Sequence, residues 1–301
     1  MSTTIVELFG HAPGDRSPAA LAARDQHRCP FIDDQCLKTL SDGTISGVCT
    51  LKPATSGPVI CCPVRLYAGQ HGILNDVAEA AFGKNVELHP PRIARRKLAR
   101  GEITGTAVAV FGKRWGGELR LPTPSGRGGY FVDWILARLK PDGDLAEFLA
   151  VEVQSIDTTG NYQAERAAYM RGGTPEASST AGFNWENVNK RILPQLIYKG
   201  HVLRREPLCK GGLVFVCPEP VYLAIRQRLG GNLQEYHPQP GALTFRWYDV
   251  GGSVPAGRIR PLEHRGQFTT TVDQVALAFT SPANLPPSKV YEQAIRSQLR
   301  S

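Results

Sequence analysis

Residues 128–162 have the sequence GGYFVDWILARLKPDGDLAEFLAVEVQSIDTTGNY, and this stretch decides the fold. Two runs rich in branched and aromatic residues, YFVDWIL and EFLAVEVQSI, flank the segment KPDGD. Such runs favour β-strands, and the proline and glycine of KPDGD favour a tight turn. The sequence therefore predicts a β-hairpin whose turn is centred between Asp142 and Gly143.

Three acidic residues fall at matching positions around this turn and the one before it. The KPDGD turn sets Asp133 opposite Glu152, with their Cβ atoms roughly 5 Å apart. A turn within PTPSGRGG (122–129) sets Glu118 opposite Asp133 in the same way. We therefore expect a three-stranded meander that carries the three acids on one face, with Gln154 beside Glu152 because strand side chains alternate.

Carboxylates on adjacent strands repel one another, so this arrangement favours a bound cation. Carboxylate oxygens suit Mg²⁺, which takes few protein ligands and keeps several waters, and such an ion promotes phosphodiester hydrolysis. The alternative is an ordinary hairpin whose acids are solvated. Three acids in matching register, with E-x-Q on an apolar strand, favour the metal site.

The first 70 residues hold five of the seven cysteines and few long periodic segments, which predicts a small loop-rich lobe. Four thiolates bind iron or zinc tetrahedrally and can replace missing core in such a lobe. The alternative is that these cysteines pack as small buried hydrophobic residues. The expected ligands follow the spacing C-x6-C-x12-C-x12-C and are Cys29, Cys36, Cys49 and Cys62, with Cys61 as the other choice for the fourth.

The chain carries 35 basic and 27 acidic residues, a formal net charge of +8, which favours a polyanionic partner and nucleic acid first. Arginines four apart in PPRIARRKLAR (90–100) share a helix face, which could bind phosphate or guanine. The alternative is a solvated basic face. The candidate DNA contacts from this segment and two later polar segments are Arg92, Arg95, Arg96, Asn161, Tyr162, Asn187 and Lys190.

The remaining patterns predict an α/β or α+β fold with a mixed sheet, divided into an N-terminal lobe (1–70) and a core (71–301). No apolar run approaches the roughly 18 residues of a membrane helix, and the N-terminus shows no secretory signal. We therefore expect a cytoplasmic protein with no membrane contact. Spacing predicts a strand over 212–217 and helices over 72–83, 90–100, 185–199 and 219–229.

The pattern D…E-x-Q on a hairpin resembles the PD-(D/E)XK nuclease core, with glutamine where lysine usually stands. The longer string GGYFVDWILARL…FLAVEVQSIDTTGNY, with the cysteine-bearing start, resembles the NotI restriction endonuclease family over roughly residues 25–230. The resemblance implies a PD-(D/E)XK core, in which helices flank a central mixed β-sheet, and a small N-terminal lobe with a structural four-cysteine iron site, zinc being possible there.

The resemblance also assigns roles to the acidic cluster. Asp133 and Glu152 would bind Mg²⁺, Gln154 would complete the motif, and Glu118 would be a supporting acid. A neutral amide cannot act as a general base, so Gln154 could only orient the attacking water or offer its carbonyl oxygen.

The function implied is type II restriction, the Mg²⁺-dependent cleavage of both strands of a GC-rich palindrome such as 5′-CGGCCG. Two-fold symmetry of the site predicts a homodimer on double-stranded DNA, and a cognate DNA methyltransferase would protect the same site in the host. The rival is a non-catalytic DNA-binding regulator with a zinc module. A pure binder gains nothing from three carboxylates that face the phosphates.

Overall fold

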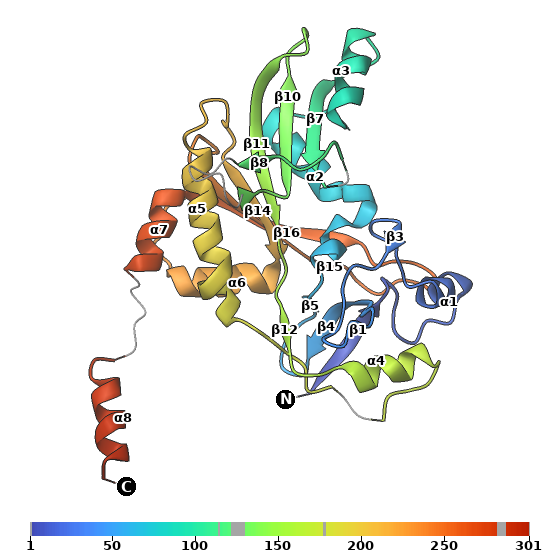
Figure 1. Ribbon diagram of the computed structural model, residues 1–301, viewed down its shortest axis with the longest axis vertical. Coiled ribbons are helices and arrows are strands. Elements are labelled where there is room, and N and C mark those ends of the chain that lie inside the picture. Colours follow the sequence, from blue (N-terminus) through green and yellow to red (C-terminus); the bar gives the residue numbers. More distant parts are fainter. Residues whose placement is uncertain (1, 114, 122–129, 177–178, 282–286, 301) are drawn as a thin grey trace.

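The computed structural model describes residues 2–113, 115–121, 130–176, 179–281 and 287–300. Within these residues the main sheet has seven strands, in the order β16-β15-β14-β11-β10-β7-β6 (Figure 1). Strands β11, β14 and β15 run parallel, as do β6 and β7, and the other neighbours are antiparallel. The mixed sheet is therefore confirmed. Its strands are β6 (Val86–His89), β7 (Thr106–Gly112), β10 (Trp134–Leu139), β11 (Leu145–Val153), β14 (Leu213–Pro218), β15 (Ala242–Val250) and β16 (Leu262–Thr271).

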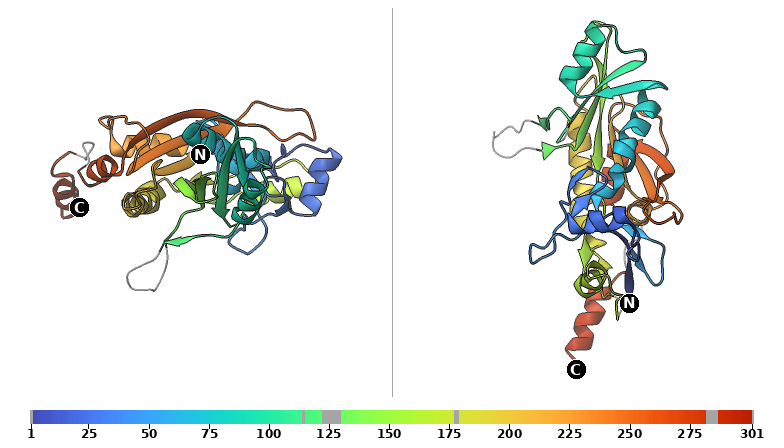
Figure 2. Two further views of the ribbon diagram at one scale, coloured as in Figure 1. Left: turned by 90° about the horizontal axis from the view of Figure 1, so that it is seen from above. Right: turned by 90° about the vertical axis from the view of Figure 1, so that its right-hand side faces the viewer.

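Helices cover both faces of this sheet (Figure 2). Apolar residues of α2 (Ala68–Phe82) pack on one face, against Val151 and its neighbours. The opposite face is covered by α5 (Leu193–Leu203), α6 (Glu219–Leu229) and α7 (Val272–Thr280). At one end of that second face, α3 (Pro91–Ala99) packs through Ala94 on β7 and β10. The core is thus two apolar layers with the sheet between them.

The β10–β11 hairpin has the register that the sequence predicts. Trp134 pairs with Val151, and the pairing continues one residue at a time to Arg138 and Glu147. The turn closes through a hydrogen bond from the Gly143 N–H to the Lys140 carbonyl, 2.9 Å long. Gly143 has φ of +83°, a conformation that glycine adopts without strain.

The prediction of one three-stranded meander is wrong. Strands β8 (Arg120–Leu121) and β9 (Tyr130–Phe131) form a separate two-stranded sheet, although their register is the one that sets Glu118 opposite Asp133. In the main sheet β10 pairs with β7 on the side away from β11, and most residues of the apolar β7 are buried there. The predicted turn over 122–129 lies outside the described residues.

The N-terminal lobe contains more regular structure than expected. It has a three-stranded sheet of β1 (Thr3–Leu8), β4 (Val48–Pro53) and β5 (Val59–Ile60) among the described residues. Later residues return to this lobe, where the backbone of Ser179 pairs with Thr3. The remaining elements around it are α1 (Pro18–Asp25), β2 (Arg28–Cys29), β3 (Asp34–Gln35), η1 (Pro63–Tyr67), β12 (Thr158–Thr159), α4 (Gln163–Met170) and β13 (Gly182–Phe183).

The predicted helices are present, with two differences in their bounds. Residues Gly69–His71 at the start of α2 have positive φ, so regular helical geometry begins at Gly72, as the spacing indicates. The predicted helix over 185–199 begins instead as the π-helical turn η2 (Val188–Ile192) and continues as α5, whose second residue is Pro194. The last helix, α8 (Val290–Gln298), has no buried residue. None of the helices in the described ranges is long and apolar enough to cross a bilayer.

A buried ion pair fixes the lobe against the rest of the chain. Arg65 donates from Nε to Glu7 Oε2 over 2.9 Å, and both side chains are almost fully buried. The same arginine donates to the Arg260 carbonyl, which lies between β15 and β16. Removing one partner of such a pair leaves a buried charge without compensation.

We therefore predict that Arg65→Met lowers the free energy of unfolding by about 3–5 kcal/mol. Urea unfolding followed by circular dichroism measures this loss. Arg28→Met is the control, because the Arg28–Asp33 pair is exposed and should leave the midpoint almost unchanged. Equal losses in the two variants would contradict the account.

Candidate active site

Two of the predicted acids lie side by side at the end of the hairpin. Asp133 immediately precedes β10 and Glu152 is the penultimate residue of β11, so the observed register places them opposite each other. Asp133 Oδ2 accepts a 2.8 Å hydrogen bond from the Val153 N–H. Glu152 is only 8% exposed, and its Oε2 is a buried oxygen without a hydrogen-bond partner.

The electrostatics of this pair show the cost of burying two carboxylates together. Burial raises the pKa of Glu152 to about 7, and the charge of Asp133 acts in the same direction. Burial also raises the pKa of Asp133, and the charge of Glu118 adds to that shift. The structure thus pairs Asp133 with Glu152, and Glu118, which is not on the main sheet, acts on Asp133 alone through its charge. Such a group of carboxylates is an environment that favours a cation.

Lys199 is a functional candidate that the sequence analysis missed. Its Nζ lies 2.5 Å from Glu152 Oε1, and its charge lowers the pKa of both Glu152 and Asp133. Lys199 lies on the buried side of α5, between Leu196 and Leu203. A lysine at a helical spacing occupied by core leucines is the signal that could have identified it.

Gln154 follows the last residue of β11. Its N–H donates to the Val216 carbonyl over 3.0 Å, which continues the parallel ladder toward β14. The side chain is half-buried and follows Glu152 by two residues, so it leaves the strand on the same side. A neutral amide at this place can orient a water molecule but carries no charge.

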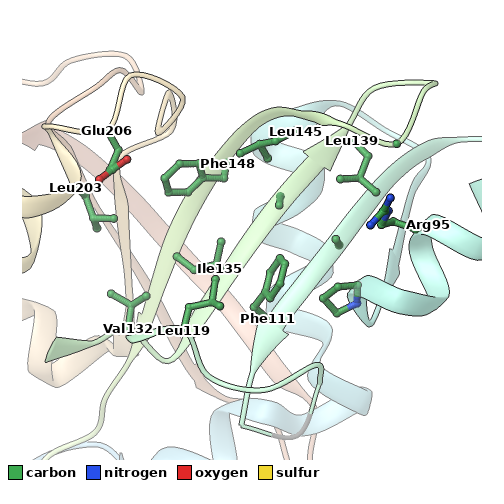
Figure 3. A pocket seen from close by; sticks show the side chains of 14 residues that line it. Arg95, Phe111, Leu119, Val132, Ile135, Leu139, Leu145, Phe148, Leu203 and Glu206 are labelled. Carbon is green, nitrogen blue, oxygen red and sulfur yellow. The ribbon is translucent and has the colours of Figure 1, made fainter. Parts of the chain in front are cut away.

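An apolar groove of about 470 Å³ lies over the face of the sheet that carries Ile135 and Phe148 (Figure 3). Val132 and Ile135 line it next to Asp133, and Arg95 of α3 and Glu206 lie on opposite sides. The rest of the lining is apolar, with Phe111, Leu119, Leu139, Leu145, Phe148 and Leu203. Among the described residues, Arg95 is the one basic side chain of this lining, and the groove carries no acid next to Asp133 and Glu152, so the carboxylate chemistry of the site is confined to the hairpin end.

The predicted DNA contacts lie on three separate elements. Arg92, Arg95 and Arg96 are exposed on α3, as the helical spacing indicates. Asn187 donates to Asp157 over 2.6 Å, and Lys190 lies 3.6 Å from Glu186.

The last two predicted contacts flank the start of α4. Asn161 is exposed, and its Oδ1 accepts from the Gln163 N–H. Tyr162 is buried, and its hydroxyl lies 3.0 Å from Ser46 Oγ. Its ring therefore packs the N-terminal lobe, and the structure does not bring it to the surface.

The predicted cysteine ligands are neighbours in the lobe. Burial raises the pKa of the Cys49 thiol, and the charge of Cys62 acts in the same direction. Burial also raises the pKa of Cys62, to about 12, although the charge of Lys38 opposes that shift. The charge of Cys29 acts on Cys49, and that of Cys36 acts on Cys62. Thiolates this close repel one another unless a cation is bound between them.

Cys61 has a different environment. Its Sγ accepts a 3.2 Å hydrogen bond from Lys38 Nζ, and it packs in the apolar cluster around β1. This contact favours Cys62 over Cys61 as the fourth cysteine of the group. Among the described residues, no group of three or more His, Cys, Asp or Glu side chains is arranged so that it could hold a metal ion. The thiols are therefore adjacent but do not form a completed ligand shell.

The comparisons with known proteins point to one family. A family model described as restriction endonuclease NotI matches residues 19–225, which is more than half of the chain. The matched span includes the cysteine group, the three acids and Lys199. The curated proteins contain no match to the chain.

The raised pKa of Glu152 predicts a pH dependence of the metal-free protein. Folding raises this pKa from 4.5 to about 7. The Glu152 carboxyl therefore makes its full contribution to the free energy of unfolding below pH 4.5, where it is protonated, and that contribution is lost as the pH rises through 7. In EDTA, Glu152→Gln should therefore gain stability relative to the unmodified protein between pH 5 and 8, on the order of 1–3 kcal/mol.

Urea unfolding at several pH values tests this expectation. Glu186→Gln is the control, since the Glu186 carboxylate is exposed. If the difference between Glu152→Gln and the unmodified protein stays constant with pH, the burial argument is contradicted.

Proposed function

The chain belongs to the NotI restriction endonuclease family, whose members are site-specific deoxyribonucleases that act on double-stranded DNA, and on this premise we propose that it is a Mg²⁺-dependent type II enzyme. One observation carries the proposal. Two carboxylates, the half-buried Asp133 and the buried Glu152, lie opposite each other on a hairpin inside the matched span. A protein that only bound DNA would bury these charges without gain, since their burial opposes folding.

The donor set fits Mg²⁺. Asp133 and Glu152 supply carboxylate oxygens. Glu152 Oε2 is buried without a hydrogen-bond partner, as expected of a metal-binding oxygen in the metal-free protein. When bound, Mg²⁺ would polarise the scissile phosphate, lower the pKa of a water molecule and stabilise the leaving oxygen. Asp133 and Glu152 would hold the ion, and Glu118 would support them through its charge on Asp133.

Gln154 has a more limited role in this proposal. Its amide would orient the attacking water or offer its carbonyl oxygen, because it cannot accept the proton. The proton of that water would then pass to a carboxylate or to the phosphate.

We predict that Asp133→Asn and Glu152→Gln each lower Mg²⁺-dependent plasmid cleavage by about 100-fold or more, with little loss of DNA binding. Gel electrophoresis measures cleavage, and a gel-shift assay in Ca²⁺ measures binding. Asp144→Asn is the matched control, because this acid of the same hairpin is exposed and pairs with Lys140. A non-catalytic regulator with a zinc module is the correct description if the unmodified protein binds DNA but never cuts it.

We also propose that Cys29, Cys36, Cys49 and Cys62 hold a structural iron ion, with zinc as the alternative metal. The support is the electrostatic interaction among these thiols and the burial of Cys29, Cys49 and Cys62, with Cys36 packed beside them. Metal binding would remove the repulsion between thiolates and stabilise the fold.

Serine at any of these four positions should lower the metal content and the thermal midpoint. Elemental analysis and thermal unfolding of the purified protein measure both. Cys209→Ser is the control, because the Cys209 thiol is equally buried but packs in the main core. Absence of stoichiometric iron and zinc from the unmodified protein would overturn the proposal.

The remaining features of the proposal concern the DNA. The target would be a GC-rich palindrome that contains GGCC, such as 5′-CGGCCG, as for a shorter-site member of the family such as EagI. A homodimer would place one carboxylate site at each strand, and a cognate methyltransferase would protect the host site. The candidate contacts that remain exposed or half-buried are Arg92, Arg95, Arg96, Asn161, Asn187 and Lys190.

A further inference from the structure

We propose that Lys199 is a positioning residue for hydrolysis, the cation that balances the carboxylate pair and holds Glu152 in place. The inference rests on the proposed function and deepens it. It assigns to a residue of α5, outside the hairpin, the positive charge that the E-x-Q segment does not carry.

The contact is specific and buried. Lys199 Nζ lies 2.5 Å from Glu152 Oε1, and the two residues are 6% and 8% exposed. A buried charged pair in contact is only weakly screened by water. The charge of Lys199 also reaches Asp133, so the ammonium serves both acids and not Glu152 alone.

Helix α5 holds the ammonium in a fixed place. Leu196 and Leu203, within four residues of Lys199 on either side, are almost fully buried in the core cluster that includes β14 and β15. Because the helix already holds the Lys199 backbone in place, little further conformational entropy is lost when its ammonium contacts Glu152. Its single charge is therefore preorganised beside the acids.

Lys199 supplies positive charge that a metal ion alone would not. The two carboxylates proposed to hold the ion and one phosphodiester carry three negative charges, and Glu118 adds another beside Asp133, whereas a divalent cation supplies only two positive ones. The Lys199 ammonium supplies the third, which Gln154 cannot do because its side chain is neutral. A buried site with an uncompensated charge would be costly to form.

The geometry also divides the two oxygens of Glu152 between two tasks. Oε1 is occupied by Lys199, and Oε2 is buried and has no partner. Lys199 thereby fixes the carboxylate plane and leaves Oε2 to face a cation. Lys199 acts through Glu152 and does not itself need to touch the DNA.

The test compares Lys199→Gln, which can still donate a hydrogen bond, with Lys199→Arg, which keeps the charge. At saturating Mg²⁺ we expect Lys199→Gln to lower kcat for plasmid cleavage by about 100-fold with little change in KM for DNA. Lys199→Arg should stay within about ten-fold of the unmodified protein. Lys140→Met is the matched control, because its ion pair with Asp144 is exposed and lies at the far end of the hairpin.

A second measurement needs no catalysis. In EDTA, a duplex carrying the site mapped from wild-type cleavage should bind Lys199→Gln about ten-fold more weakly, because the uncompensated acids repel phosphate. The double variant Glu152→Gln/Lys199→Gln should recover the lost affinity and melt at a higher temperature than Lys199→Gln, since neither buried charge then remains. If Lys199→Gln does not fold, recovery of folding in this double variant and activity of Lys199→Arg support the inference.

The outcomes separate the two proposals. If the unmodified protein cuts DNA and Lys199→Gln cuts equally fast, the inference is overturned and the proposed function stands. The inference is also overturned if Lys199→Arg is as inactive as Lys199→Gln, since charge would not be the property that matters. If the unmodified protein does not cut DNA at all, the proposed function and the inference fail together.

Discussion

The withdrawal of two neighbouring carboxylates from water, Glu152 fully and Asp133 in part, is the constraint on which the site depends. Asp133 and Glu152 lie where the β10–β11 ladder ends, and Asp133 completes that ladder by accepting from the Val153 N–H. Burial raises the pKa of both acids, so the fold must place positive charge nearby to keep them ionised. Within the described residues, that charge comes from Lys199 on the helix that covers this face of the sheet.

The architecture explains why this charge comes from a distant part of the chain. Strand β11 is central in the sheet, with β10 antiparallel on one side and β14 parallel on the other. The chain between β11 and β14 passes through the N-terminal lobe and returns along α5 over the face that bears Glu152 (Figure 1). The route between the two strands thus delivers Lys199 to the acids.

The sequence could predict those parts of the fold that rest on local chemistry. The proline and glycine of KPDGD fix the hairpin register, and with it the position of Asp133 opposite Glu152. The division of YFVDWIL into two strands was not predictable, because its first part, β9, pairs with β8 whereas its second part, β10, pairs with β7. Strand propensity alone does not decide which partner wins.

Long-range contacts account for what the sequence did not predict. Lys199 is 47 residues from Glu152, and no spacing rule connects a helix face to one strand position. Tyr162 follows the hairpin closely, yet its hydroxyl bonds Ser46 within the lobe. For this site, charge balance predicts the contact better than sequence spacing does. A buried acid requires a partner of opposite charge, and so does a lysine on the apolar face of a helix.

The central claim is that Asp133 and Glu152 together hold a divalent cation against DNA, and the position of such an ion tests it most directly. Crystals of the protein with a site-containing duplex and Mn²⁺ would locate the ion by its anomalous scattering. We predict a peak bound by Asp133 and by Glu152 Oε2, with Lys199 still on Oε1. An ordered duplex with no peak shared by these two carboxylates would contradict the account.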